Sequence, residues 1–221
     1  MRTFLRVAAG VVAAASMAAV AFGQQEFPPP QGKGRVVVVA SGMSGPEHYR
    51  AVSADLAQMG YDVVLFDGEA MEGTHGEALK TAIAQAQQMP HALPGKVALV
   101  SFSAGGGITL YYGSQLPDLV TGVVVWYPAT SMIRDVPGFV SRIKVPVLMF
   151  AGEKDTYRNC CLITTAHTLA DAATAAGAQF VLVTYPKTEH DFVRNGAHYN
   201  ASSYADALQR TQARLKEYLG N

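Results

Sequence analysis

One stretch decides how the rest of the chain is interpreted: Val97-Ala98-Leu99-Val100-Ser101-Phe102-Ser103-Ala104-Gly105-Gly106-Gly107. It begins with a short apolar run without polar alternation, which is typical of a strand buried on both faces. Small residues follow at once, and a helical stretch comes after them. The stretch therefore predicts a strand, a tight turn at Ser103 and a helix.

Further apolar runs of the same kind lie on either side of this one. Val-rich runs that do not alternate, separated by longer segments with helical spacing, indicate a parallel sheet covered by helices on both faces. The strands that we expect cover residues 36–40, 62–66, 97–102, 122–126, 145–151 and 180–184. The predicted fold class is therefore α/β, with about six mostly parallel strands.

Two later segments carry a clear helical stripe. Apolar side chains recur at helical spacing from Leu162 to Ala173 and from Tyr204 to Leu219, and such stripes usually face a core.

The linker from Pro128 to Lys144 is too short to build a lid over the carboxyl edge of the sheet, so we expect an open site. Residues 35–221 show no internal repeat and are predicted to form one domain.

The chain ahead of this domain has a different character. Residues 1–23 carry Arg2 and Arg6 before an uncharged run rich in Ala and Val, and end in Ala21-Phe22-Gly23, the pattern of a secretory signal peptide. The run is shorter than the roughly 20 residues of a spanning helix. We therefore expect export to a periplasm or the medium without stable membrane insertion, an uncleaved anchor being the alternative. Residues 24–34, rich in Pro and Gly, are predicted to be an extended lead-in without a strand.

The composition excludes several classes of protein. The chain has 221 residues, of which 49% are hydrophobic and 15% charged, which fits a globular domain and not a disordered or low-complexity chain. Lys plus Arg and Asp plus Glu both number 17, so no long-range field would attract nucleic acid. We therefore expect no nucleic-acid partner.

Ser103 has the sequence context of a catalytic nucleophile. A strand-to-helix turn sharp enough to expose it needs small residues two positions before and after, which Ser101 and Gly105 supply. Ser101 replaces the first Gly of the G-x-S-x-G pattern, and a purely structural turn is the competing interpretation. The following helix would bring the amide of Ala104 and a positive dipole end to a developing oxyanion.

Candidate partners for Ser103 follow two later strands. Asp155 lies on the loop after residues 145–151, with Glu153 as a competing carboxylate, and His190 follows the last strand, with His198 as the alternative base. Functional residues of open parallel sheets gather beyond the carboxyl ends of the strands. The chain order Ser, Asp, His is that of the α/β-hydrolase triad, in which the histidine takes the serine proton and the aspartate orients the histidine.

Other residues are expected to surround these three. The second oxyanion donor should be a backbone amide of the loop after the first strand, at Gly42 or Met43. The candidates for the substrate pocket, each with another role such as core packing as the alternative, are His48, Tyr127, Tyr157, Arg158 and Phe192.

The sequence indicates neither a metal nor a cofactor. The six His show no H-x-x-x-H spacing and the two Cys no C-x-x-C spacing. The loop Ser41-Gly42-Met43-Ser44-Gly45 fails the dinucleotide pattern G-x-G-x-x-G. For the adjacent Cys160 and Cys161 the favoured interpretation is a pair of small apolar residues at a helix start, and a vicinal disulfide is the alternative.

With these motifs in place, the chain resembles the dienelactone hydrolase family of α/β hydrolases from Arg35 to Leu219. The segments that carry the resemblance are residues 36–39 with the Gly-containing loop after them, 56–64, 101–106, 151–155, 185–186 and 190–192. The resemblance implies a minimal, lidless α/β-hydrolase fold and carries the nucleophile, acid and histidine over to Ser103, Asp155 and His190. Ser103 stands where named members have Cys, as in general carboxylesterases, and Ser41 stands at about the position of a family Glu.

We therefore expect a serine hydrolase that cleaves a carboxylic ester or lactone through an acyl-enzyme intermediate, with a small molecule as its partner and with no cofactor. Two alternatives remain. One is another acyl-transfer enzyme, a transferase or peptidase, on the same triad. The other is a catalytically silent binding protein that keeps the fold. The sequence gives no indication of the oligomeric state.

Overall fold

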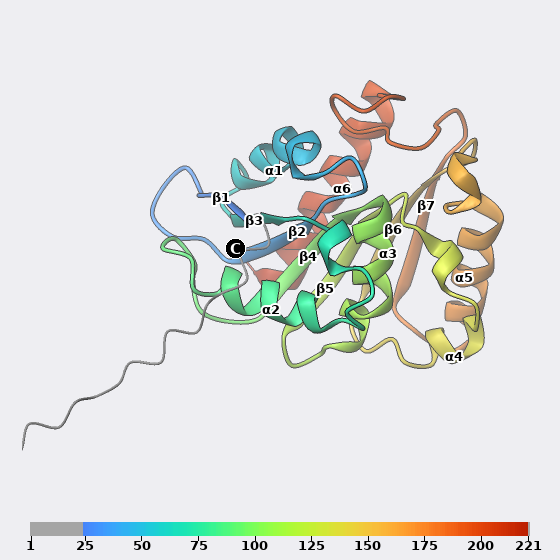
Figure 1. Cartoon of the computed structure of the whole chain (residues 1–221), viewed down its shortest axis with the longest axis horizontal. Helices are drawn as coiled ribbons and strands as arrows, with labels where there is room; N and C mark the ends of the chain where they lie inside the picture. Colours follow the sequence, from blue (N-terminus) through green and yellow to red (C-terminus); the bar gives the residue numbers. More distant parts are fainter. Residues whose placement is uncertain (1–23, 221) are drawn as a thin grey trace, which may run out of the picture.

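Seven strands form one sheet in the computed structural model, which describes residues 24–220 (Figure 1). The strands are β1 (Gln25–Phe27), β2 (Val36–Ala40), β3 (Asp62–Phe66), β4 (Val97–Phe102), β5 (Val120–Trp126), β6 (Val147–Gly152) and β7 (Phe180–Tyr185). Their spatial order is β1-β3-β2-β4-β5-β6-β7. The chain reverses its direction of travel across the sheet between β2 and β4, and such a switch point opens a crevice at the carboxyl ends of the strands.

The predicted α/β fold is confirmed, and its six expected strands are all present, with ends that shift by at most two residues. The expectation that residues 24–34 hold no strand is wrong. Residues 25–27 form β1, which pairs antiparallel with β3 through Gln25 and Leu65, Glu26 and Val64, and Phe27 and Val63. Without β1, one side of β3 would present unpaired amides and carbonyls to solvent, and covering such an edge is favourable. The predicted signal peptide, residues 1–23, lies outside the described residues.

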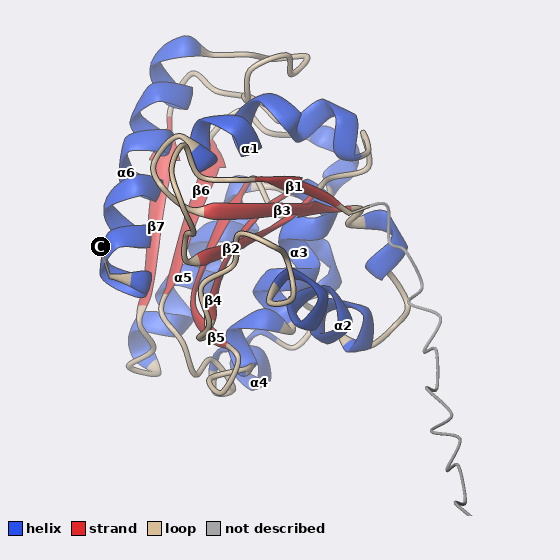
Figure 2. Ribbon diagram, turned by 90° about the vertical axis from the view of Figure 1, so that its left-hand side faces the viewer, coloured by secondary structure: helices blue, strands red, loops and turns tan. Residues whose placement is uncertain are grey.

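Helices cover both faces of the sheet (Figure 2). The α-helices are α1 (Arg50–Ala57), α2 (Glu77–Ala86), α3 (Ser103–Tyr111), α4 (Val136–Val140), α5 (Ile163–Ala175) and α6 (Ala201–Leu219). The 3-10 turns are η1 (Pro46–Tyr49), η2 (Glu69–Met71), η3 (Gly113–Gln115), η4 (Thr130–Met132) and η5 (Tyr157–Asn159). Helices α1 and α6 pack on one face, and α2 to α5 pack on the other. Among residues 24–220, no helix is long and apolar enough to span a membrane.

The strands are apolar on both sides because both faces of the sheet are buried. In β2, Val36 and Val38 pack toward α2 while Val37 and Val39 pack toward α1. Every residue of β2 is buried, which explains why the sequence shows no alternation. The wholly buried Trp126 at the end of β5 faces α6.

The linker between β5 and β6 does not form a lid. It folds into η4 and the short helix α4, whose Phe139 is wholly buried in the core on the α2 side. Helix α4 packs against α5. The linker therefore covers part of the α2 side of the sheet and forms no lid over its carboxyl edge.

Replacement of Leu56 by Ala tests how strongly α1 depends on its buried face. Leu56 is wholly buried between α1 and the sheet, so Leu56→Ala should lower the free energy of unfolding by about 2–5 kcal/mol, measured by urea titration. The matched control is Leu93→Ala, because the side chain of Leu93 is 38% exposed. Equal losses for the two variants would contradict this description of the core.

Candidate active site

Ser103 occupies the sharp turn between β4 and α3. It is the first residue of α3 and has a φ of 48°, whereas Phe102 before it is extended. A positive φ is uncommon for a residue that carries a Cβ, and such strained positions cluster at functional sites. The turn predicted at Ser103 is therefore present, with the serine in the backbone conformation of a nucleophile elbow.

Glycines in the first turn of α3 allow the elbow to sit between two neighbouring loops. A Cβ at Gly105 would collide with the carbonyl oxygen of Ser41, to which the Gly105 amide donates a hydrogen bond of 3.2 Å. On the other side, the Ser103 carbonyl accepts a hydrogen bond of 2.8 Å from the amide of Ala129. The loops after β2 and β5 thus clamp the start of the helix.

The structure brings Ser103, His190 and Asp155 together in a hydrogen-bonded row. The Oγ of Ser103 lies 2.9 Å from Nε2 of His190, and Nδ1 of His190 lies 2.7 Å from Oδ2 of Asp155. The three residues are 5%, 6% and 2% exposed, so these contacts are largely shielded from water. Each residue follows a different parallel strand, which is why they meet at one edge of the sheet.

Backbone contacts hold the acid in place. The second carboxylate oxygen of Asp155 accepts a hydrogen bond of 3.0 Å from the amide of Tyr157. The amide of Lys154 donates to the carbonyl of Thr188 at 3.0 Å, which ties the loop of the acid to the loop of the histidine.

The two competing sequence candidates lie outside this row. Glu153 accepts a hydrogen bond of 2.9 Å from the hydroxyl of Thr184 on the surface. His198 lies 3.4 Å from Glu189, with both side chains about half exposed. The geometry therefore selects Asp155 over Glu153 and His190 over His198.

Two tyrosines fix the plane of the His190 ring. The ring of Tyr157 stacks on it with centroids 4.5 Å apart and an angle of 7° between the planes. The ring of Tyr127 meets it edge-on at 4.7 Å. The imidazole is thus restrained on two sides while it remains able to exchange a proton with Ser103.

A cavity of about 220 Å³ opens in front of Ser103. Its lining residues are Met43, Ser44, Tyr49, Ser103, Tyr157, His190, Asp191, Ala197 and His198. They come from the loop after β2, from η5 and from the loop between β7 and α6. The cavity is therefore bounded by loops that connect the core elements.

The candidate oxyanion donors lie beside the nucleophile. Ala104 follows Ser103 in the first turn of α3, and a Cβ at Gly42 would lie 2.8 Å from the Cβ of Ser103. The amide of Gly42 faces the hydroxyl of Tyr49, whereas Met43 lines the cavity. Both predicted loop residues therefore lie near Ser103 or its cavity.

Of the predicted pocket residues, Tyr157 lines the cavity and the other four do not. Tyr127 and Phe192 are wholly buried, and Phe192 stacks on Trp126 in the core. Nε2 of His48 lies 2.9 Å from Oδ1 of the lining residue Asp191. The guanidinium of Arg158 lies 5.3 Å from the centre of the Tyr157 ring. Sequence position beside the triad did not reveal which side chains turn inward.

Among the lining residues that the sequence did not indicate are Tyr49 and Asp191. The hydroxyl of Tyr127 donates to Oδ1 of Asp191 at 3.4 Å and lies against that of Tyr49. Burial, and then the negative charge of Asp191, raises the pKa of Tyr49 well above its ordinary value. Tyr49 therefore stays a neutral phenol beside the nucleophile. Tyr49 lies beyond Gly45, the end of the Gly-containing loop, and no sequence motif includes it.

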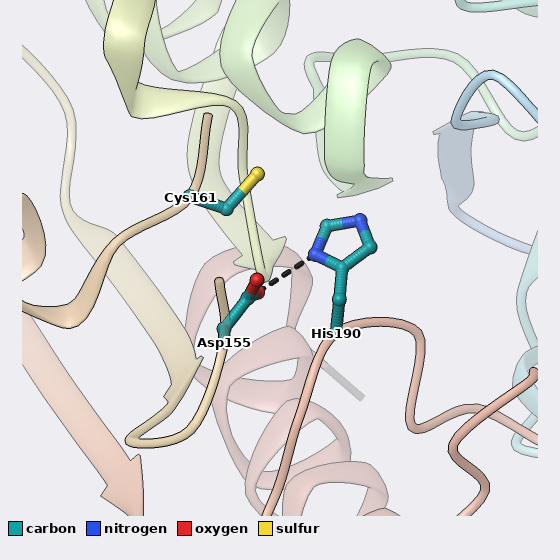
Figure 3. A group of neighbouring side chains, drawn as sticks. All are labelled: Asp155, Cys161 and His190. Carbon is teal, nitrogen blue, oxygen red and sulfur yellow. Dashed lines mark hydrogen bonds and ion pairs between the residues drawn. The ribbon is translucent and has the colours of Figure 1, made fainter. Parts of the chain in front are cut away.

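Cys160 and Cys161 form a disulfide with each other, so the favoured interpretation of two free residues is wrong. The bond joins neighbouring residues directly after η5. Cys161 lies beside Asp155 and His190 (Figure 3), with ligand atoms of all three within 4.8 Å. The carbonyl of Cys160 accepts hydrogen bonds from the amide and the hydroxyl of η4 residues Ser131 and Thr130. The disulfide-bonded pair therefore connects the segment after Asp155 to η4 and helps to hold it in place.

Comparison with known proteins identifies a family. The family model named "Dienelactone hydrolase family" matches residues 68–219. A candidate carboxymethylenebutenolidase from Synechocystis sp. is 29% identical over 142 residues, which cover 61% of this chain and 55% of that protein. Protein usf from Aquifex pyrophilus is 28% identical over 130 residues, 57% of this chain and 53% of that protein. The chain thus spans about half the length of the curated relatives it matches.

Solved structures share the fold at lower identity. A candidate dienelactone hydrolase from Klebsiella pneumoniae has a TM-score of 0.75 and 23% identity, covering 88% of this chain and 92% of that one. Esterase 2 of Thermogutta terrifontis, phosphorylated by paraoxon, has a TM-score of 0.70 and 17% identity, covering 89% of both chains. Its butyrate-bound form has a TM-score of 0.67 and 16% identity, again covering 89% of both chains.

The glycines of the elbow provide a direct test of its packing. Gly105→Ala should lower the free energy of unfolding by about 1–3 kcal/mol, because the added methyl collides with the Ser41 backbone. The neighbouring Gly106→Ala is the matched control. Its Cβ would lie 3.2 Å from Pro128, and the change should stay within about 1 kcal/mol because Ala favours a helix. Urea unfolding measures the two changes in free energy. Equal losses for the two variants would contradict the close packing of Gly105 against Ser41.

Proposed function

The chain belongs to the dienelactone hydrolase family, and from that premise we propose that it is a serine hydrolase that cleaves a carboxylic ester or lactone. The observation that carries the proposal is the row from Ser103 Oγ through the His190 ring to Asp155, with distances of 2.9 and 2.7 Å. These distances fall within the range of a nucleophile and base in hydrogen-bond contact.

In the proposed first step, Oγ of Ser103 attacks the carbonyl carbon of the ester. A serine hydroxyl is a weak nucleophile, so Nε2 of His190 removes its proton as the C–O bond forms. Asp155 accepts the hydrogen bond from Nδ1, which fixes the tautomer and stabilises the imidazolium. His190 then gives the proton to the leaving alcohol, and the acyl group remains on Ser103.

In the second step, His190 removes a proton from water, which attacks the acyl-enzyme. The C–O bond to Ser103 breaks, the serine recovers its proton from His190, and the acid is released. The negative charge on the carbonyl oxygen in both steps is held by the amide of Ala104 and by one amide of the loop that carries Gly42 and Met43. The N-terminus of α3, at which Ser103 lies, adds a favourable dipole.

The size of the cavity favours a short substrate. About 220 Å³ bounded by Tyr49 and Tyr157 suits a small acyl group. The binding of butyrate by esterase 2 of Thermogutta terrifontis supports the same choice. We therefore take short-chain or cyclic esters as the substrate class.

Export is also part of the proposal. The charged and apolar pattern of residues 1–23 is that of a signal peptide. The Cys160–Cys161 disulfide supports an oxidising compartment, because disulfides persist mainly outside the reducing cytosol.

Replacement of the nucleophile tests the proposal directly. The wild type should react with a fluorophosphonate probe and hydrolyse 4-nitrophenyl acetate and butyrate. Ser103→Ala should lose labelling and lower kcat by about five to six orders of magnitude, because no group then forms the acyl-enzyme. Intact-protein mass spectrometry and ester turnover measure the two effects. Labelling that persists in Ser103→Ala would rule out this nucleophile.

The acid is tested with a matched pair of carboxylates on one loop. Asp155→Asn should lower kcat by about 10⁴-fold, because the amide favours the wrong tautomer of His190. Glu153→Gln should leave kcat within about twofold, since the Glu153 carboxylate accepts its hydrogen bond from Thr184 on the surface and not from His190. A large loss in Glu153→Gln, or none in Asp155→Asn, would contradict the assignment.

A further inference from the structure

A second cluster of ionisable side chains lies at the amino end of the sheet, remote from Ser103. It consists of Glu26 in β1, Asp62 at the start of β3 and His91 in the loop between α2 and β4. One ligand atom of each residue lies within 4.8 Å of the others. These are the distances at which three side chains can bind one ion.

Asp62 is the buried member of this cluster. The residue is 0% exposed, and neither carboxylate oxygen accepts a hydrogen bond from an N–H or O–H donor of the described residues. Its acidic neighbour is the carboxyl group of Glu26. An ionised carboxylate without a partner in such a place is strongly destabilised. The buried carboxylate therefore requires either a proton or a cation.

The other two residues are held in place around it. Oε1 of Glu26 accepts a hydrogen bond of 3.2 Å from the His91 amide and lies 3.0 Å from its Nδ1. The loop of His91 is itself fixed by two backbone hydrogen bonds with Gly34, of 2.9 and 2.8 Å. The three side chains are thus arranged before any ligand arrives, which lowers the entropy lost on binding.

The cluster is closed on one side and open on the other. Asp62 is sealed inside, whereas the side chains of Glu26 and His91 are 19% and 44% exposed. A cation can therefore enter from solvent and keep a water molecule as a further ligand.

The donor set and its charge match a divalent transition metal. Two carboxylates carry two negative charges, and a neutral imidazole adds a nitrogen ligand that zinc accepts well. We propose that Glu26, Asp62 and His91 bind one zinc ion. The ion joins β1 and β3 to the loop before β4, so its role is to hold the edge strand on the sheet. The metal takes no part in the ester chemistry at the opposite end of the strands.

The sequence pattern could not indicate this site, because its ligands come from three separate segments. The competing arrangement is a proton shared between the carboxyl groups of Asp62 and Glu26, which the structure places side by side. The two arrangements differ in whether zinc binds.

Calorimetric titration of the chelator-treated full chain with zinc chloride at pH 7.5 tests the proposal. The wild type should bind one zinc ion, and at about 100 times the Kd its Tm should rise by roughly 5–10 °C. Glu26→Gln and His91→Gln should each weaken binding at least tenfold; both residues are partly exposed, so these variants should fold. Hydrogen exchange of the β1 amides should slow on addition of zinc in the wild type only.

Two controls exclude binding elsewhere. His198→Gln removes a histidine that also faces a glutamate but no buried carboxylate, and it should bind zinc as the wild type does. Ser103→Ala should also bind normally, which separates this site from the triad. Absence of stoichiometric zinc binding would overturn the proposal in favour of the shared proton. Binding that survives in both Glu26→Gln and His91→Gln would overturn it as well.

Discussion

The close approach of α3 to the loops after β2 and β5 is the contact on which the candidate site depends. It requires glycine, since a methyl group at Gly105 would collide with the backbone of Ser41. The approach holds Ser103 at a φ of 48° and turns its hydroxyl toward the cavity. It also places the loop of Gly42 and Met43 beside the start of the helix. One steric constraint therefore sets the position both of the candidate nucleophile and of the candidate oxyanion donors.

The remaining parts of the site are ordered from the strands outward. Parallel strands deliver Ser103, Asp155 and His190 to one edge, and hydrogen bonds between the loops then align them. Tyr157 contacts two of these residues at once: its amide donates a hydrogen bond to the Asp155 carboxylate, and its ring stacks on His190. The same residue therefore helps to orient both Asp155 and His190, and it also lines the cavity.

The sheet and the triad could be predicted because their signals are local. Val-rich runs mark buried strands, and Ser103, Asp155 and His190 each follow one of them. β1 escaped prediction because Gln25 and Glu26 have no strand-like apolar character; the unpaired edge of β3 determines their conformation. Tyr49 and Asp191 escaped it because which side chains face the cavity depends on how two distant loops pack. The buried Asp62 lay within a predicted strand, but its lack of a partner is visible only in three dimensions.

The disulfide between Cys160 and Cys161 has a practical consequence for protein chemistry. The chain has only these two cysteines, and each is occupied by the other. Under non-reducing conditions, a single cysteine introduced at an exposed position such as Tyr199 in the loop before α6 would be the one reactive thiol of the molecule. A fluorophore or a solid support could then be attached at a chosen distance from the cavity, with the native sulfur atoms left undisturbed.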